Sequence, residues 1–225
     1  MSEYRDLVSD FPTRCDSLLH LFEKQARRQR LEITLMLCIA APSIIVPFER
    51  LQSPKPRPDG SKSLGHPSRD WTRFLQAKSA FDNLCAQRFL GSPLWPNATA
   101  GSWHFDELSD VSGDPDGWRE LRTPKPLGRN RTINRVLKHV RNALAHGNIF
   151  TRGGDEITQL LFVSKPDQNI EKFWFLAASP DDFRIFLKNW LDFLRTVNLP
   201  TGVVPESSAA WFLDQETSVS ATEAH

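Results

Sequence analysis

The sequence predicts a mainly α-helical protein with one small β-hairpin. Five segments carry apolar residues at helical spacing, and two short β-like runs, 157–163 and 170–177, precede the last of them. The 225 residues are enough to bury a substantial core in one large domain. We therefore expect a single domain over residues 1–197, with the hairpin at 156–178, and a poorly ordered tail over 198–225.

Two helices are expected near the N-terminus. Residues 11–30 show an amphipathic pattern. Its apolar side is expected to contain Leu18, Leu19 and Phe22. Residues 31–41 are almost entirely apolar, which predicts a central core helix that Pro42 breaks or kinks and that does not continue regularly past Pro47. The apolar run 33–48 is shorter than the roughly 20 residues that span a bilayer, so we expect a buried helix and no membrane contact.

The middle of the chain alternates between irregular segments and one helix. Residues 52–68 are rich in Pro, Ser and Gly and are expected to form a loop, and residues 68–90 carry an apolar stripe typical of a helix. Residues 92–128 have no long period, but a structureless loop of that length is unusual inside a compact domain. We therefore expect a long ordered insertion. Its anchors on the body are expected to be Trp95, Trp103, Phe105 and Trp118.

Two further helices flank the hairpin. Residues 130–145 predict a helix that ends at Gly147, because glycine readily adopts the conformation that terminates helices. Its buried side is expected to comprise Ile133, Val136, Leu137, Val140 and Leu144. Serine is a favoured N-cap residue and proline a favoured first residue of a helix. Ser179 and Pro180 therefore predict the start of a helix over 181–197.

Positive charge is concentrated around the helix predicted over 130–145. Between Leu121 and Gly154 the chain contains no Asp or Glu. It contains eight basic residues there: Arg122, Lys125, Arg129, Arg131, Arg135, Lys138, Arg141 and Arg152. Such a local positive field suits a polyanion. A solvated helix face that is neutralised by the preceding acidic segment would produce the same pattern.

The most informative stretch is Arg-Asn-Ala-Leu-Ala-His-Gly, residues 141–147, at the end of this helix. Arginine can hold a phosphate with a fork of donors, and histidine can move protons near neutral pH. Asn142 and His146 are four residues apart and share a helix face, with Arg141 on the adjoining flank. These three residues are the predicted catalytic set for phosphodiester chemistry without a metal. The alternatives are a helix-terminal histidine bonded to a backbone carbonyl and an arginine in a surface ion pair.

Other chemistries are not indicated. The three cysteines form no CxxC pair, and the six histidines show no metal-ligand spacing with Cys or acidic residues, so we expect neither a metal nor a cofactor. There is no glycine-rich phosphate loop and no Gly-x-Ser-x-Gly motif. The scattered cysteines and the polar N-terminal residues favour a reduced, cytoplasmic compartment.

Residues 141–148 resemble the Arg-x4–6-His motif of the HEPN superfamily, in which Asn, Asp or His usually follows the arginine late in the third core helix. Segments Asp10–Cys15 and Pro47–Leu51 are similar to HEPN-like proteins of plasmids and bacterial defence loci, and a hairpin and a Ser-Pro-Asp-Asp-Phe helix start follow the motif in the same order. The resemblance covers roughly residues 5–197, apart from the insertion at 92–128. It implies a HEPN-type helical bundle.

The resemblance also implies a metal-independent endoribonuclease that acts as a homodimer, with two motifs facing one another across a shared cleft. In such a site His146 would remove the ribose 2′-OH proton, and a histidine would protonate the leaving 5′-oxygen. Arg141 would hold the non-bridging phosphate oxygens, and Asn142 would position the phosphate or the imidazole. RNA is the expected substrate, and a toxin or defence role with an antitoxin or regulatory partner is expected by analogy.

Further residues are expected to bind the nucleic acid. They are Arg129, Arg131, Arg135, Lys138, His139, Asn148 and Arg152. Two other functions fit the same sequence. One is a catalytically inactive HEPN-like dimeric module that binds nucleotide, RNA or a protein partner. The other is a structural interaction protein whose basic helix faces an acidic partner or the chain's own acidic insertion.

Overall fold

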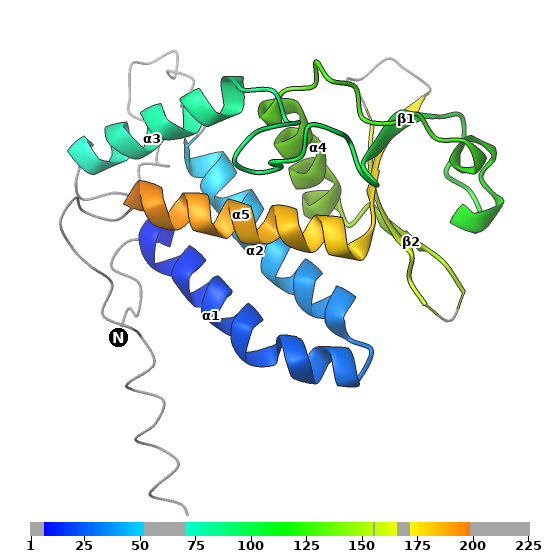
Figure 1. Ribbon diagram of the computed structural model, residues 1–225, viewed down its shortest axis with the longest axis horizontal. Helices are drawn as coiled ribbons and strands as arrows, with labels where there is room; N and C mark the ends of the chain where they lie inside the picture. The colour runs from blue at the N-terminus through cyan, green and yellow to red at the C-terminus, as the bar shows by residue number, and fades with distance from the viewer. Residues whose placement is uncertain (1–6, 52–70, 155, 166–171, 199–225) are drawn as a thin grey trace, which may run out of the picture.

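The computed structural model describes residues 7–51, 71–154, 156–165 and 172–198. In these ranges it contains five α-helices and one four-stranded antiparallel sheet (Figure 1), so the mainly α-helical prediction is confirmed. The predicted loop at 52–68 and the predicted tail from residue 199 onward lie outside the described residues.

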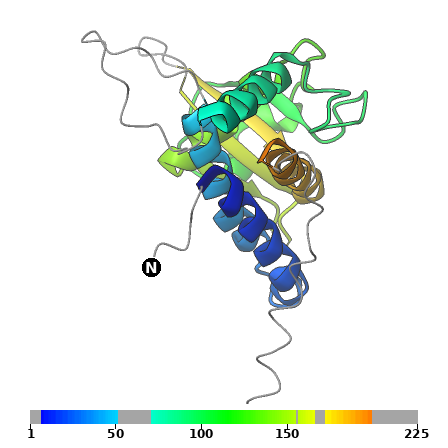
Figure 2. The same ribbon diagram turned by 90° about the vertical axis from the view of Figure 1, so that its left-hand side faces the viewer.

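The helix α1, Leu7–Arg28, packs against α2, Glu32–Leu51, and the two run side by side in both ribbon views (Figures 1 and 2). The predicted apolar side of α1 is only partly right. Leu19 is buried, but Leu18 and Phe22 are 46% and 50% exposed. The buried side chains of α1 are instead those of Cys15, Leu19 and Ala26. Successive side chains of a helix point about 100° apart, so Leu18 does not share the buried side of its neighbour Leu19.

The helix α2 continues through Pro42 and Pro47, which corrects the predicted break. Each internal proline removes a backbone hydrogen bond and costs about 3 kcal/mol. Beyond Pro42 the helix buries Ile44, Phe48 and Leu51, and each such side chain contributes about 1.5–3 kcal/mol when it leaves water. This burial offsets the cost of the prolines.

The helix α2 is also long and apolar enough to cross a membrane, judged by length and composition over Glu32–Glu49, the one such helix in the described part of the chain. In the fold, 44% of that window is buried. The helix contacts all four other helices and contributes seven side chains to the main core. This is the arrangement of a core helix.

The helix α3, Trp71–Ala86, ends before its predicted limit at residue 90. The chain leaves the helix because its backbone pairs with the segment that leads into the next helix. The Phe89 N–H donates to the Arg131 carbonyl at 2.8 Å, and the Gln87 carbonyl accepts from the Ile133 N–H at 3.0 Å.

The segment 92–128 is ordered, and it adds a strand that the sequence analysis did not predict. It contains β1, His104–Leu108, and two short 3-10 turns, η1, Pro115–Gly117, and η2, Arg119–Arg122. Three of the four predicted aromatic anchors are buried, namely Trp95, Trp103 and Trp118, and the fourth, Phe105, is half-buried.

The sheet has the strand order β1-β4-β3-β2. The predicted hairpin is confirmed as the antiparallel pair of β3, Gln159–Ser164, with β4, Phe173–Ala178. The outer strand β2, Ile149–Arg152, was not predicted. One face of the sheet packs on the helices and the other packs on the 3-10 turns (Figure 1).

The helix α4, Ile133–His146, carries the motif, and α5, Pro180–Asn198, follows the sheet. All five residues predicted on the buried side of α4 are buried. Gly147 adopts the left-handed conformation at φ 68° and ends α4 as predicted. The Ser179 hydroxyl accepts from the Asp182 N–H at 3.2 Å, which confirms the predicted N-cap of α5.

The two neighbouring leucines of α1 test its orientation. Leu19→Ala is expected to lower the free energy of unfolding by about 2–5 kcal/mol, since it leaves a cavity in the core. Leu18→Ala is expected to change it by no more than about 0.5 kcal/mol, since this side chain is largely exposed. Urea denaturation followed by circular dichroism measures both. Equal losses would show that Leu18 is covered in solution.

Candidate active site on α4

The predicted catalytic residues lie on the last two turns of α4. His146 is the final residue of the helix and is exposed. Gly147 ends the helix directly after it, with its N–H directed at the carbonyls of Ala143 and Leu144. Within the described ranges the His146 imidazole bonds to no backbone carbonyl, which disfavours the purely structural interpretation of this residue. Its ring is open to a ligand or a second chain.

Arg141 is held in place by two neighbours. Its Nη2 forms an ion pair with Glu49 of α2, and its Nη1 donates to the Asn142 side-chain oxygen at 2.8 Å. Its Nε is buried and has no hydrogen-bond partner in the described part of the chain. The Arg141 side chain is still 27% exposed and that of Glu49 is 46% exposed. The guanidinium is therefore oriented beside Asn142 while one edge remains accessible to solvent.

Glu49 is one of the site residues that were not predicted from the sequence. It lies in the segment Pro47–Leu51, which carries part of the family resemblance. Its place in this segment could have marked Glu49 as a candidate site residue, but the sequence does not show which basic side chain Glu49 contacts.

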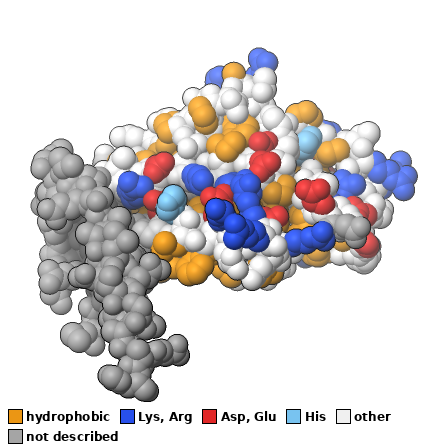
Figure 3. Space-filling view, turned by 60° about the horizontal axis from the view of Figure 1, so that its bottom comes forward, with side chains coloured by type: hydrophobic (Ala, Val, Ile, Leu, Met, Phe, Trp, Pro, Cys, Tyr) orange, Lys and Arg blue, Asp and Glu red, His pale blue; other side chains and the backbone are white. Residues whose placement is uncertain are grey.

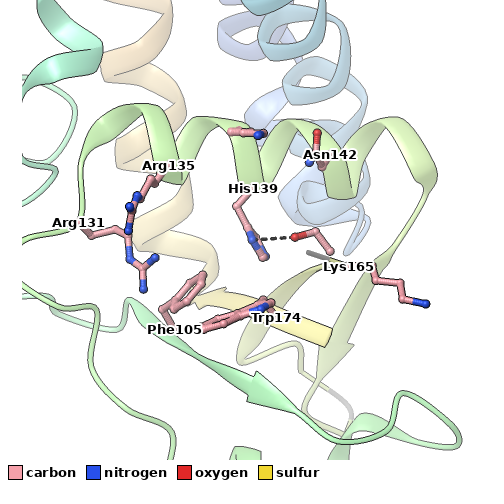
Figure 4. A pocket seen from close by; sticks show the side chains of 9 residues that line it. Phe105, Arg131, Arg135, His139, Asn142, Lys165 and Trp174 are labelled. Carbon is pink, nitrogen blue, oxygen red and sulfur yellow. Dashed lines mark hydrogen bonds between the residues drawn. The ribbon is translucent and has the colours of Figure 1, made fainter. Parts of the chain in front are cut away.

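A pocket of about 480 Å³ lies beside α4, on the flank that bears Asn142 (Figure 4). Four of the predicted nucleic-acid-binding residues line it, namely Arg131, Arg135, Lys138 and His139. Lys165, at the end of β3, and the aromatic rings of Phe105 and Trp174 complete most of its lining. Neither Lys165 nor Trp174 belongs to a sequence motif that indicates function.

His139 differs from its prediction as an exposed RNA-binding residue, because it is only 8% exposed. Its Nε2 lies 2.7 Å from the Phe162 carbonyl, and its Nδ1 lies 2.9 Å from the Ser164 hydroxyl. A carbonyl only accepts, so Nε2 carries the hydrogen and Nδ1 accepts from Ser164. His139 falls between Val136 and Val140 on the buried side of the helix, and this periodicity was a usable signal of burial.

Burial also fixes the charge of His139. Desolvation lowers the pKa of His139 to about 4, a shift that the hydrogen bond to the Phe162 carbonyl opposes and that nearby Arg131 reinforces. The ring is therefore neutral at pH 7. It can hold β3 against α4, but it cannot serve as a cation for phosphate.

The other predicted nucleic-acid-binding residues lie away from the pocket. Arg129 and Asn148 are exposed. Arg152 connects β2 to the insertion, since its Nε pairs with Asp116 at 3.1 Å and its Nη1 donates to the Leu121 carbonyl at 2.9 Å. Its guanidinium is thus already engaged by the protein.

The predicted neutralisation of the basic segment by the acidic insertion occurs at two places among the described residues. These are the Arg152–Asp116 pair and the Lys125–Asp106 pair. The face turned forward in Figure 3 shows a similar mixture, with basic and acidic side chains interspersed. The cations of the pocket are different, because no carboxylate within the described ranges lines it.

Comparisons with known proteins identify a matching family. A sequence model of the family described as HEPN pEK499 p136 matches residues 1–200. No curated protein and no solved structure matches the chain. Among the described residues, no group of three or more His, Cys, Asp or Glu side chains is placed to hold a metal ion.

The buried histidine predicts a pH dependence of stability. The unfolded chain takes up a proton at His139 as pH falls below 6.5, whereas the folded chain resists it until about pH 4. The neutral ring therefore favours the fold above pH 6.5, and this contribution, at most about 3 kcal/mol, is lost as pH falls toward 4. We expect the unfolding free energy of the His139→Gln protein, measured by urea titration, to fall less steeply between pH 6.5 and about pH 4 than that of the wild type.

The matched control for this measurement is His20→Gln, because His20 is exposed on α1. It should keep the wild-type pH dependence. A His139→Gln protein with the wild-type slope would contradict a depressed pKa at this position.

Proposed function

This chain belongs to the HEPN pEK499 p136 family, and from that premise we propose that it is a metal-independent endoribonuclease acting through Arg141, Asn142 and His146. One observation carries the proposal. The last two turns of α4 present an exposed imidazole and an oriented guanidinium, next to a pocket lined by four basic side chains. Acid–base and anion-binding groups are thus adjacent, as cleavage of a phosphodiester requires.

The chemistry assigns a separate role to each residue. His146 removes the proton of the ribose 2′-OH, and the 2′-oxygen attacks the adjacent phosphorus while the bond from phosphorus to the 5′-oxygen breaks. A second histidine protonates the leaving 5′-oxygen. Arg141 binds the non-bridging oxygens and offsets the charge of the pentavalent transition state. The Asn142 oxygen already accepts from Arg141, so its NH2 group is the part left to position the phosphate. The products are a 2′,3′-cyclic phosphate and a 5′-hydroxyl.

The two proton transfers favour a dimer. One histidine does not readily act as base and acid at once, whereas two protomers supply two. The position of His146 at the exposed end of α4 supports a site in which two copies face one another, within a HEPN-type bundle. We extend the proposal to a cytoplasmic toxin or defence effector under the control of an antitoxin or regulatory protein, on family analogy alone.

A second candidate function is a catalytically inactive module that binds RNA or nucleotide. The Glu49 carboxylate favours it, because Glu49 partly neutralises the arginine that would hold the phosphate. In this case the pocket would bind its ligand without cleavage.

The first test compares the wild type with His146→Ala on end-labelled single-stranded RNA in EDTA. We expect the wild type to leave cyclic phosphate ends, and we expect the variant to lose at least about a hundredfold in rate, since general acid–base catalysis contributes about 10²–10⁴. RNA with a 2′-deoxy substitution at the cleaved ribose should remain intact. His20→Ala, at an exposed histidine of α1, is the matched control.

Cleavage that survives in His146→Ala, or that needs a divalent metal, would refute this mechanism. Absence of cleavage in the wild type on a broad set of RNAs, together with retained binding, would favour the inactive module.

The ion pair on Arg141 makes a separate prediction about kinetics. If Glu49 positions the guanidinium, Glu49→Gln should lower kcat about tenfold or more, because the transition state loses an oriented donor. KM should stay the same or fall, because a negative charge near the RNA is removed. Glu23→Gln, which breaks ion pairs with Arg184 and Lys188, should leave both parameters unchanged. A rise in kcat for Glu49→Gln would show that the carboxylate inhibits the site.

A further inference from the structure

The pocket beside α4 has an aromatic floor. Trp174 lies across this floor beside Phe105, with ring centroids 5.0 Å apart and planes inclined by 28° (Figure 4). Phe105 is already covered by Arg131, whose guanidinium carbon lies 3.7 Å from the ring centroid. Trp174 is half-buried and lines the pocket, so it is the aromatic surface that a ligand can reach.

Among the described residues, the charged side chains that line the pocket are all positive. Arg135 and Lys138 project from α4, and Lys165 lies at the end of β3. No carboxylate within the described ranges forms an ion pair with these residues or with Arg131. Desolvation, reinforced by neighbouring Arg135, lowers the pKa of Arg131. A bound anion would relieve this repulsion.

The pocket also holds one oriented acceptor. Ser164 donates its hydroxyl hydrogen to Nδ1 of His139, whose tautomer is fixed by the Phe162 carbonyl. The lone pairs of the Ser164 oxygen are therefore left to accept a hydrogen bond. The basic side chains around it can only donate hydrogen bonds, whereas the Ser164 oxygen can accept one from an N–H group of a ligand.

We propose that this pocket binds one unpaired nucleotide, with its base stacked on Trp174 and its phosphate held by Arg135, Lys138 and Lys165. The volume of about 480 Å³ lies within the usual range of small-molecule sites. Proteins recognise unpaired bases by stacking on aromatic rings and by hydrogen bonds to the base edges, which a duplex does not offer.

The pocket is continuous with the catalytic motif through Asn142. This residue lines the pocket and also accepts the hydrogen bond from Arg141. Lys138, Asn142 and His146 follow one another at four-residue steps, so they lie along one side of α4 over about 12 Å. Where the nucleotide belongs to an RNA strand, the inference rests on the proposed function, and it places cleavage next to an unpaired base.

The test is direct binding of a fluorescent single-stranded oligonucleotide with 2′-O-methyl riboses, which lacks the attacking 2′-OH. Fluorescence anisotropy should show a loss of about tenfold or more in affinity for Trp174→Leu, since one stacked base is lost. Trp174→Phe keeps a stacking ring and should stay within about threefold of the wild type. Retained binding by Trp174→Leu would overturn the proposal.

A charge variant covers the case in which Trp174→Leu does not fold. Arg135→Gln should weaken binding and reduce the slope of log K against log salt by about 0.7, the value for one phosphate contact on a single strand. Arg28→Gln, an exposed cation at the end of α1, should leave both unchanged. Equal effects of Arg135→Gln and Arg28→Gln would show that binding depends only on the overall charge of the protein, and would overturn the proposal.

Two competitors distinguish the sources of the nucleotide. A duplex of the same sequence should fail to displace the labelled strand, and effective displacement by the duplex would contradict an unpaired base. Nucleoside 5′-monophosphates should displace it only weakly if RNA is the ligand. Displacement with the affinity of the oligonucleotide would support the same pocket with a free nucleotide as its ligand.

The binding assay separates this inference from the proposed function. Oligonucleotide binding that depends on Trp174, without cleavage of any RNA by the wild type, would support the pocket and count against the nuclease. If RNA cleavage requires His146 but oligonucleotide binding is the same in the Trp174 variants, the nuclease proposal is supported and the proposed nucleotide-binding pocket is refuted.

Discussion

The burial of one face of α4 is the constraint on which the rest of the site depends. The helix packs against α2 and β3, and residues such as Val136, Val140 and Leu144 are excluded from water. Because the helix repeats every 3.6 residues, this fixes which side chains point outward. Helical periodicity exposes Lys138 and His146 and buries Val140, so the proposed catalytic motif needs no separate scaffold.

The contact between α4 and the sheet also builds the pocket. His139 bonds to the Phe162 backbone and to Ser164, so it fixes the helix relative to β3. The register of the sheet then places Trp174 opposite Ser164 on β4. A slip of one residue would turn Trp174 to the other face of the sheet. The neutral, buried histidine is thus structural, although its type and its basic neighbours suggested a ligand contact.

The sequence predicted the features that local pattern determines. The buried side of α4, its end at Gly147 and the Ser179 cap follow from helical periodicity and from capping chemistry. The edge strand β1 was not predicted, because it owes its structure to β4, which is distant in sequence. The edge strand β2 pairs with β3, which is close in sequence, but its four residues are too few to show a clear alternating pattern. The continuation of α2 past Pro42 likewise depends on burial that only the assembled core supplies. The same holds for the site, where the motif was local but the Glu49 and Trp174 contacts are not.

The Glu49–Arg141 pair bears most directly on whether the site is active. Both side chains are partly exposed, and ion pairs of this kind contribute only about 0–1 kcal/mol. The carboxylate therefore competes only weakly with a phosphate for the exposed edge of the guanidinium. An oriented donor, in contrast, contributes about 10²–10³ to the rate of reactions that develop charge on oxygen. The balance favours Glu49 as a residue that continues to orient Arg141 while the exposed edge of the guanidinium binds the phosphate, so the ion pair is compatible with catalysis.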